Sequence, residues 1–581
     1  MEDRTGITQP PSHPADRTVL AAKTIYRFYL SYRHEFRLIT RRAPLRFARQ
    51  DWNGVQQDAN ERFDVYSKRL DKALAKIRDM LDNNLEDEEL WKRIRTAYSR
   101  TVGKCEDREI AETFFNSVCR RVFTTVGVNP DIEFVGSESN PAEPRAETSV
   151  IRTVFSNDSL ETLICRVLSV SDLGIPFENL ERDAREIAGR MAAAGNPGPH
   201  RLLRADMMRA PFFRGKGAYL IGRLTAGDRK IPLTVAVINR KGKAVCDGLI
   251  QDEAGMRLIF SYTHTYFHVD VDSAVEVARF LKLLLPEKRT AELYISLGFN
   301  RHGKTELYRD LVRHQSVCEK PFDLSPGKPG MVMVVFNMPD DDLVFKVIRD
   351  RFGKPKRTTR REVIGKYDFV ARHDRTGRLP DTQTFEFLKF RRCCFSERLI
   401  GELATECSRS VSIADDHVVL NYVYVERRVV PLDVFLETAD PADAASAVVD
   451  YGLAIKDLAL SNIFPGDLLL KNFGLTRLGR VIFYDYDEIC PLTDCRFRRM
   501  PRPRTVEEEM AAAPWFHVEE NDIFPEEFGH FLGLPDPLRR VLLKHHGDLL
   551  DAEFWRRAQE SVRSGKRFNV FPYRRFSAAA S

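Results

Sequence analysis

A short stretch between residues 467 and 485 restricts the fold of this chain most strongly. Asp467 stands five residues before Asn472, and the apolar run from Val481 to Tyr484 ends in Asp485. A short apolar run bounded by polar residues is typical of a buried strand. If both segments converge at the end of one β-hairpin, their oxygen side chains gather at one place. The spacing of Asp467 and Asn472 alone favours a solvated surface turn, and it is the strand leading into Asp485 that favours a site.

This pattern matches the requirements of phosphoryl transfer. Protein kinases place a catalytic Asp five residues before a metal-binding Asn, and a strand ending in a second metal-binding Asp follows. One carboxylate stands beside the attacking hydroxyl, and the other two oxygen ligands suit the hard cation Mg²⁺. Lys471 precedes Asn472, where its ammonium can neutralise the transferring phosphoryl group.

A second signal lies upstream, in a Gly-bearing turn before a predicted strand pair. On its own the turn is weak, because it lacks the G-x-G-x-x-G pattern and such turns are common. Lys346 is stronger evidence for a kinase-like site than the turn, because a Lys flanked by Val, Phe and Ile on a buried strand needs an anionic partner. The order of loop, Lys, Asp, Asn and Asp is that of a kinase. The turn comprises Ser325, Pro326, Gly327, Lys328, Pro329, Gly330 and Met331.

Two further segments have open alternatives. The group from His373 to Gln383 contains Asp374, Arg375 and Arg378, which read most simply as a charged turn, and Asp381, which is placed to cap a helix starting at Thr382. The segment Tyr424 to Arg428 lies between apolar strands. It is either an inter-lobe hinge that offers backbone groups to adenine or an edge turn.

The pattern along the chain predicts an α+β fold. Apolar residues recur at helical steps from Val19 to Cys119, and aromatic side chains among them read as core. A hairpin of Met331–Asn337 and Leu343–Ile348 opens a second unit. We expect a mainly helical regulatory domain with a small β-rich insertion over residues 1–318, then a bilobal kinase-like domain over 319–581, with lobes of about 319–430 and 431–581. The predicted β-rich runs are Ala218–Leu224, Pro232–Asn239, Lys243–Ile250 and Phe260–Val271.

Composition and charge argue against several classes of protein, including nucleic-acid binders, secreted proteins and membrane-spanning proteins. The net charge is only 90 − 84 = +6 over 581 residues, which disfavours a dedicated nucleic-acid binder. Basic clusters at Lys354–Arg361 and Arg496–Arg504 read as solvated surface or as docking sites for an acidic protein. The N-terminus lacks an apolar signal region, and no apolar stretch approaches the roughly 20 residues of a bilayer span. Ten scattered cysteines without CxxC fit a cytoplasmic, reducing compartment.

Together these motifs resemble the bacterial isocitrate dehydrogenase kinase/phosphatase family. The resemblance covers nearly the whole chain and is highly specific in combination. It is carried by residues 325–331, Lys346, His373–Phe385, Glu426–Arg428 and Asn462–Ile489, and by Ala111–Val118, Thr290–Tyr294, Lys304–Glu306 and Pro525–Phe528.

The resemblance implies an enzyme that phosphorylates a serine of isocitrate dehydrogenase and removes the same phosphate. It thereby controls the branch between the Krebs cycle and the glyoxylate bypass. The resemblance further implies one nucleotide site, with AMP as an effector acting partly through the N-terminal region. By position, the resemblance implies that Ser325–Met331 and Lys346 bind ATP. It implies that Asp467 is the kinase acid/base with Lys471 beside it, and that Asn472 and Asp485 hold Mg²⁺ or Mn²⁺. It also implies that Asp381 serves the phosphatase reaction and that Asp487 contributes to it. Between Gly327 and Gly330, backbone amides suit phosphate better than the side chains of Lys328 and Pro329, except at Pro329, which has no N–H.

Two rival functions stay open at this point. One is a kinase-like phosphotransferase acting on another protein or on a small molecule. The other is a catalytically dead nucleotide-binding scaffold, against which the retained Asp467, Asn472 and Asp485 argue. The expected partner is isocitrate dehydrogenase, without nucleic acid or membrane, and a homodimer stays open as the assembly.

Overall fold

The fold is taken from a computed structural model of the chain. It describes residues 14–136, 150–196, 203–261, 266–317, 320–326, 329–338, 341–353, 356, 358–501, 505, 510, 516–565 and 570–576. Backbone contacts divide the chain into two compact units, which are described separately. The first comprises residues 1–256, 267–317 and 574–581, and the second comprises 257–266 and 318–573.

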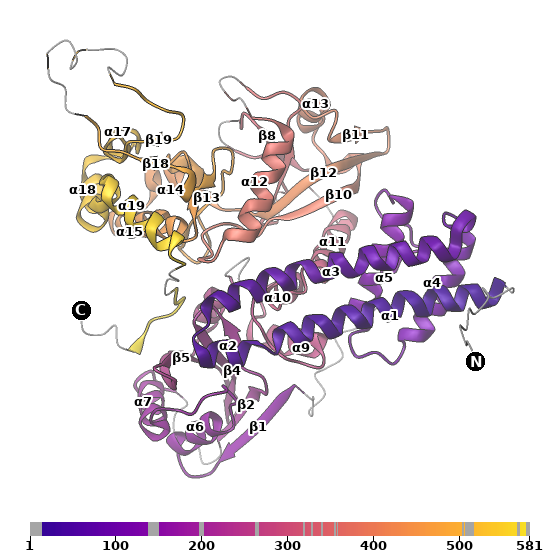
Figure 1. The fold of residues 1–581 in the computed structure, drawn as a ribbon, viewed down its shortest axis with the longest axis horizontal. Helices are drawn as coiled ribbons and strands as arrows, with labels where there is room; N and C mark the ends of the chain where they lie inside the picture. The colour runs from indigo at the N-terminus through magenta and orange to yellow at the C-terminus, as the bar shows by residue number, and fades with distance from the viewer. Residues whose placement is uncertain are drawn as a thin grey trace, which may run out of the picture. The chain divides into compact units, whose positions relative to one another are not determined.

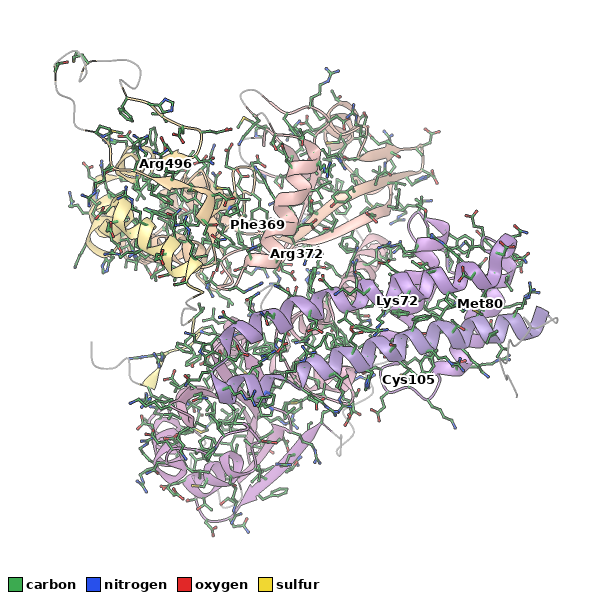
Figure 2. The ribbon with its side chains drawn as sticks, in the orientation of Figure 1. Lys72, Met80, Cys105, Phe369, Arg372 and Arg496 are labelled. Carbon is green, nitrogen blue, oxygen red and sulfur yellow. The ribbon has the colours of Figure 1, made fainter. Side chains whose placement is uncertain are left out.

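The first unit opens with the predicted helical array. Helices α1 and α3 run side by side (Figure 1), and their aromatic side chains meet those of α5. The Tyr32 ring centroid lies 5.1 Å from that of Tyr66 and 6.3 Å from that of Phe114. Figure 2, in which Lys72 and Met80 mark α3, shows the side chains along these helices. The bounds are α1 (Pro14–Thr40), α2 (Ala43–Arg49), α3 (Trp52–Leu81), η1 (Asp82–Asn84), α4 (Glu88–Val102) and α5 (Arg108–Phe123).

The β-rich insertion is an antiparallel sheet of order β1-β2-β4-β5-β6, with β3 paired to β4. Helices α6 (Leu160–Ser169) and α7 (Leu180–Ala193) share a core with it. The strand predicted over Phe260–Val271 is wrong: among its described residues only His268 bridges to Phe213. The strands are β1 (Ile151–Ser156), β2 (Leu203–Met208), β3 (Phe212–Arg214), β4 (Gly217–Ala226), β5 (Arg229–Arg240) and β6 (Lys243–Ile250).

Helices complete the first unit after the sheet. These are α9 (Ala274–Leu284), α10 (Thr290–Ser296) and α11 (Asn300–Val317). Helix α8 (Glu253–Ile259) precedes them in the sequence and includes the boundary between the two units after residue 256. Helix α11 packs on α10 and on α5. Arg575, near the end of the chain, pairs with Asp247 of β6 at 2.7 Å, so the last described residues pack with this unit. Among the described residues, no helix is both long and apolar enough to cross a bilayer.

The second unit begins with an antiparallel sheet of order β10-β12-β9-β8-β7, with β11 also paired to β12. The predicted hairpin is confirmed as β8 and β9. Helix α12 lies against these strands (Figure 1) and buries Val363, Tyr367 and Val370, which share one face. The elements are β7 (Asp323–Leu324), β8 (Met333–Asn337), β9 (Leu343–Ile348), α12 (Arg360–His373), β10 (Gln383–Arg391), η2 (Arg392–Cys394), α13 (Glu397–Glu406), β11 (Val411–Ile413) and β12 (His417–Arg427).

The rest of the second unit is mainly helical around helix α15, which buries one face. Helices α18 and α19 pack on α15, and the fully buried Trp555 of α19 contacts the rings of Phe464 and Phe497. The elements are β13 (Val430–Pro431), α14 (Leu432–Thr438), α15 (Pro441–Leu460), β14 (Ile463–Phe464), η3 (Leu470–Asn472), β15 (Phe473–Leu475), β16 (Val481–Phe483), β17 (Cys490–Pro491), η4 (Leu492–Asp494), β18 (Arg496–Phe497), β19 (Asp522–Ile523), η5 (Pro525–Glu527), α17 (Phe528–Phe531), α18 (Asp536–His546), η6 (Gly547–Leu550) and α19 (Ala552–Arg563).

Candidate active site

The predicted hairpin near residue 472 exists. Strands β15 and β16 pair antiparallel with Phe473 opposite Phe483. The N–H of Tyr484 donates to the backbone oxygen of Asn472 at 3.0 Å, so Asn472 lies next to the segment that carries Asp485. Asn472 is buried, and Asp485 is half-buried. The hairpin therefore brings the two candidate metal ligands to the same end of one β-ladder.

Asp467 is held by the turn before η3. Its carboxylate accepts a hydrogen bond from the N–H of Leu469 at 2.9 Å, and the side-chain amide of Asn472 donates to its backbone oxygen at 3.5 Å. Gly466 has φ +78°, and an added Cβ would lie 2.5 Å from the backbone oxygen of Glu488. The positive φ and the close contact with Glu488 both require a residue without a Cβ atom, so only glycine fits at position 466. Lys471 is exposed, and the Tyr484 hydroxyl donates to its backbone oxygen.

The predicted phosphate loop joins β7 to β8. These strands pair antiparallel, and the N–H of Ser325 donates to the backbone oxygen of Val335 at 3.0 Å, which closes the hairpin below the loop. Pro326, Pro329 and Met331 are exposed. Gly330 is exposed too, and an added Cβ would lie 2.9 Å from the backbone oxygen of Met333. Gly327 and Lys328 lie outside the described residues.

Lys346 has the anionic partner that its buried position requires. Its ammonium lies 2.7 Å from a carboxylate oxygen of Glu426 and donates to the backbone oxygen of Tyr484 at 2.9 Å. Glu426 is 2% exposed and sits on β12, the strand beside β9. Lys346 thus connects the sheet to the residue immediately before Asp485.

This partner differs from the one usual in kinases, where a helix supplies the glutamate. In this chain the glutamate of α12, Glu362, is used at the helix N-terminus, where it completes a capping box with Thr359. Helix α12 instead places Tyr367 against the sheet, stacked on Tyr424 with ring centroids 3.8 Å apart. Sequence reasoning missed the role of Glu426, because the pairing depends on the register of two strands far apart in sequence.

Asp381 lies just before β10. Its carboxylate accepts a hydrogen bond from the side-chain amide of Gln383 at 3.0 Å, and the Thr382 hydroxyl donates to Glu426 at 2.9 Å. The interpretation of Asp381 as a helix cap is wrong, because Gln383–Arg391 forms strand β10. Asp381 therefore stands beside the residue pair that includes Lys346.

Asp487 carries the clearest electrostatic signal of the site. Burial, reinforced by the charge of Asp485, raises its pKa to about 6, against the opposing effect of nearby lysines. One of these, Lys356, lies 3.8 Å from Asp487 and 2.6 Å from Glu488. Lys356 belongs to the predicted basic cluster, and it is largely buried rather than solvated. Lys366 of α12 donates to the backbone oxygen of Asp487.

The donor set fits a hard divalent cation. Asn472, Asp485 and Asp487 offer oxygen atoms, and a bound cation would offset the negative charge of the neighbouring Asp485 and Asp487 carboxylates. Lys346, held by Glu426, supplies the fixed ammonium that a nucleotide phosphate needs. The arrangement suits phosphoryl transfer from a metal–nucleotide complex.

Comparison with known proteins agrees with this geometry. Residues 320–575 match the family model described as isocitrate dehydrogenase kinase/phosphatase (AceK) kinase domain, and residues 22–319 match that of the AceK regulatory domain. The chain belongs to the isocitrate dehydrogenase kinase/phosphatase family. A relative of that name from Anaeromyxobacter sp. (strain Fw109-5) is 45% identical over 97% of this chain and 98% of its own length. Another relative of that name, from Xanthomonas euvesicatoria pv. vesicatoria (strain 85-10), is 38% identical over 98% of this chain and 99% of its own length.

Arg378 of this family member is a structural anchor of the site. Asp374, Arg375 and Arg378 are interpreted from the sequence as a simple charged turn, but Asp374 is 0% exposed and Arg378 is 4% exposed, so this segment is not solvated surface. Its guanidinium binds Asp450 at 2.8 Å and Asp457 at 2.7 Å, both on α15. Its backbone oxygen accepts from the N–H of Phe483 at 2.8 Å. Arg378 therefore fixes strand β16, which leads into Asp485.

Loss of the Glu426 charge is expected to weaken nucleotide use. Glu426→Gln keeps the shape of the side chain but leaves the Lys346 ammonium without its buried carboxylate. A hydrogen bond to a charged group contributes about 1.5–3 kcal/mol, so kcat/KM for ATP should fall about 10- to 100-fold. Steady-state kinase kinetics measure this. Glu402→Gln, which removes a partly exposed partner of Arg349, is the control and should leave kcat/KM unchanged. Equal kinetics in the two variants would contradict the role of Glu426.

Removal of the Asp487 carboxyl is expected to stabilise the fold at neutral pH. The pKa of Asp487 is raised from 3.8 to about 6, so the folded protein binds more protons than the unfolded chain between these values. Stability is therefore lost as pH rises through this window, by up to about 3 kcal/mol. Asp487→Asn should raise the free energy of unfolding at pH 7.5 and raise it much less at pH 4.5, as denaturant titrations can measure. Asp415→Asn, at an exposed turn, is the control. An equal gain at both pH values would refute this electrostatic account.

Proposed function

We propose that this chain phosphorylates a serine of isocitrate dehydrogenase with ATP and removes the same phosphate. The observation that carries the proposal is the contact of Lys346 with Tyr484. This contact joins the nucleotide-binding lysine of the sheet to the hairpin that holds Asn472 and Asp485. Family membership supports the choice of protein substrate, since the relatives carry that substrate in their name. Regulation of the branch between the Krebs cycle and the glyoxylate bypass follows from that substrate.

In the kinase direction, the serine oxygen attacks the γ-phosphorus of ATP and the bond to the β-phosphate oxygen breaks. Asp467 orients the hydroxyl and accepts its proton. Lys346 holds the phosphates from the sheet, Lys471 approaches the transferring group from the solvent side, and amides of the loop from Ser325 to Met331 cover the nucleotide. Mg²⁺ or Mn²⁺, held by Asn472 and Asp485, would neutralise charge on the phosphates when bound.

In the phosphatase direction, water attacks the phosphoserine phosphorus and the bond to the serine oxygen breaks. A carboxylate has to take a proton from the water, and the serine oxygen regains one. Asp381 is the candidate base, and Asp487 contributes. The pKa of Asp487, raised to about 6, supports this role, because a base with a pKa near the working pH transfers protons efficiently.

The phosphatase assignment is tested by Asp381→Asn. We expect phosphatase turnover to fall about 10²–10⁴-fold, the usual contribution of a general base. Thermal unfolding checks that the variant folds, and kinase activity in the same preparation checks that the nucleotide site is intact. Full phosphatase turnover by a folded variant would remove Asp381 from the mechanism.

Regulation and location complete the proposal. AMP is the proposed effector, acting partly through the regulatory region of residues 1–318, with residues 319–581 as the catalytic domain. The protein is proposed to act in the cytoplasm, without nucleic acid or membrane, and a homodimer is the assembly to test. The nine described cysteines are free thiols, which supports a reducing compartment.

The decisive experiment incubates the purified chain with Mg-ATP and isocitrate dehydrogenase, then removes ATP or adds AMP. We expect dehydrogenase activity to fall and then recover, with label from the γ-phosphate first appearing on a serine of the dehydrogenase. Label on a small molecule or on another protein would indicate the rival phosphotransferase. No metal-dependent ATP turnover would indicate a nucleotide-binding scaffold.

A further inference from the structure

Two helices of the first unit bring together a histidine and two carboxylates, none of which belongs to the proposed active site. Glu109 lies on α5, and His302 and Glu306 lie one turn apart on α11. The Nε2 atom of His302 stands 3.8 Å from a carboxylate oxygen of Glu109 and 4.0 Å from one of Glu306. All three ligand atoms lie within 4.8 Å of one another. His302 is 1% exposed, so the cluster is closed from solvent on the histidine side.

The hydrogen bonds around His302 favour one tautomer. The Thr113 hydroxyl lies 3.1 Å from the backbone oxygen of Glu109, to which it can donate its one hydrogen. With its hydrogen on that oxygen, the hydroxyl accepts from His302, whose Nδ1 lies 2.8 Å away and carries the proton in this arrangement. In the neutral ring, Nε2 then presents a lone pair toward the two carboxylates. A histidine oriented through its other nitrogen is the usual arrangement for a metal ligand.

A lone pair facing two carboxylates needs a cation between them. The Nε2 atom is buried and makes no hydrogen bond. A proton on Nε2 would draw an oxygen to about 2.7–3.2 Å, and both oxygens stand well beyond that distance. Around an ion with bonds of about 2.0–2.2 Å, neighbouring ligand atoms lie roughly 3.3–3.6 Å apart, which is closer to the observed spacing. Arg309 pairs with Glu306 beside the cluster.

We propose that Glu109, His302 and Glu306 bind one divalent transition-metal ion of the Zn²⁺ class. Mixed imidazole and carboxylate ligands suit Zn²⁺ and disfavour Mg²⁺, which takes oxygen ligands. Water would complete the coordination. The ion would join α5 to α11, and α11 ends at Val317, just before the catalytic unit begins. Its direct effect is on the stability of the first unit.

The test uses the full chain stripped of metal with a chelator and then dialysed against Zn²⁺. We expect one bound equivalent that persists in Asp485→Asn, a rise in Tm on adding Zn²⁺, and Co²⁺ absorption bands typical of nitrogen and oxygen ligands. His302→Gln and Glu306→Gln should each lose that equivalent and the rise in Tm. Thr113→Val, which removes only the orienting hydrogen bond, should lower the Zn²⁺ affinity about 10- to 100-fold.

The control is His417→Gln, at a surface histidine beside Asp416 in the second unit, and it should bind Zn²⁺ like the unaltered chain. Folding of each variant is checked by its Tm without metal. The proposal is overturned if the unaltered chain binds no stoichiometric Zn²⁺ or Co²⁺. It is equally overturned if folded Glu306→Gln binds as tightly as the unaltered chain. Either result would leave the cluster without a metal-binding role.

Discussion

Asp467→Asn should lower the kinase kcat about 10²–10⁴-fold, the largest effect we expect from one substitution on the kinase reaction. The asparagine keeps the shape of the side chain and can still accept the hydrogen bond from the N–H of Leu469. It cannot take a proton from the substrate serine. The loss should therefore fall on kcat, with little change in KM for ATP, because Asp467 is not proposed to contact the nucleotide.

The measurement is transfer of labelled phosphate to isocitrate dehydrogenase under saturating Mg-ATP. Asp415→Asn, at an exposed turn before β12, is the matched control and should keep full activity. The Tm of Asp467→Asn should stay close to that of the unaltered protein. If the variant kept more than about a tenth of the activity, Asp467 would not be the catalytic base.

Arg378→Met should give the largest loss of stability, about 3–5 kcal/mol. The substitution leaves Asp450 and Asp457 of α15 without the guanidinium that neutralises them, and it removes a hydrogen bond of 2.9 Å to the backbone oxygen of Val481. The pKa of Arg378 shows how strongly the charge is held: burial alone would lower it, and the two aspartates raise it well above its ordinary value.

Denaturant unfolding of the full chain, followed through the transition of the second unit, measures this loss in the free energy of unfolding. Arg392→Met, which breaks a more exposed pair with Glu397, is the control and should cost no more than about 1 kcal/mol. Arg378→Lys should be intermediate, because a lysine keeps the charge but lacks the fork that binds both acids. An Arg378→Met protein as stable as the control would mean that the network contributes little.

The sequence was most informative where function depends on local spacing. The separation of Asp467 and Asn472 and the strand before Asp485 predicted the hairpin that the structure contains. Lys346 was predicted to need an anion because its neighbours on the strand are apolar, and Glu426 satisfies that need. The specific roles of these residues in catalysis stay predictions.

What the sequence could not supply depends on contacts between distant segments. Glu426 pairs with Lys346 through the register of β12 and β9, which no local pattern encodes. Residues from Thr382 onward were expected to be helical, but Gln383–Arg391 is a strand that pairs along β12. Tertiary pairing overrode the local preference. Arg378 looked like a surface charge, since its acids on α15 lie more than 70 residues away.

The stacking of Tyr367 on Tyr424 has a consequence for how this enzyme can be switched. The Tyr367 ring also contacts Tyr486 edge to face, with centroids 4.8 Å apart, so the helix, the sheet and the segment after Asp485 meet in one cluster of phenol rings. A helix attached through an ion pair can swing outward when that pair breaks. Here an outward swing would expose three rings that are now at most 8% accessible. Control by ligands is therefore expected to act on nucleotide occupancy or on substrate docking, while α12 stays in place.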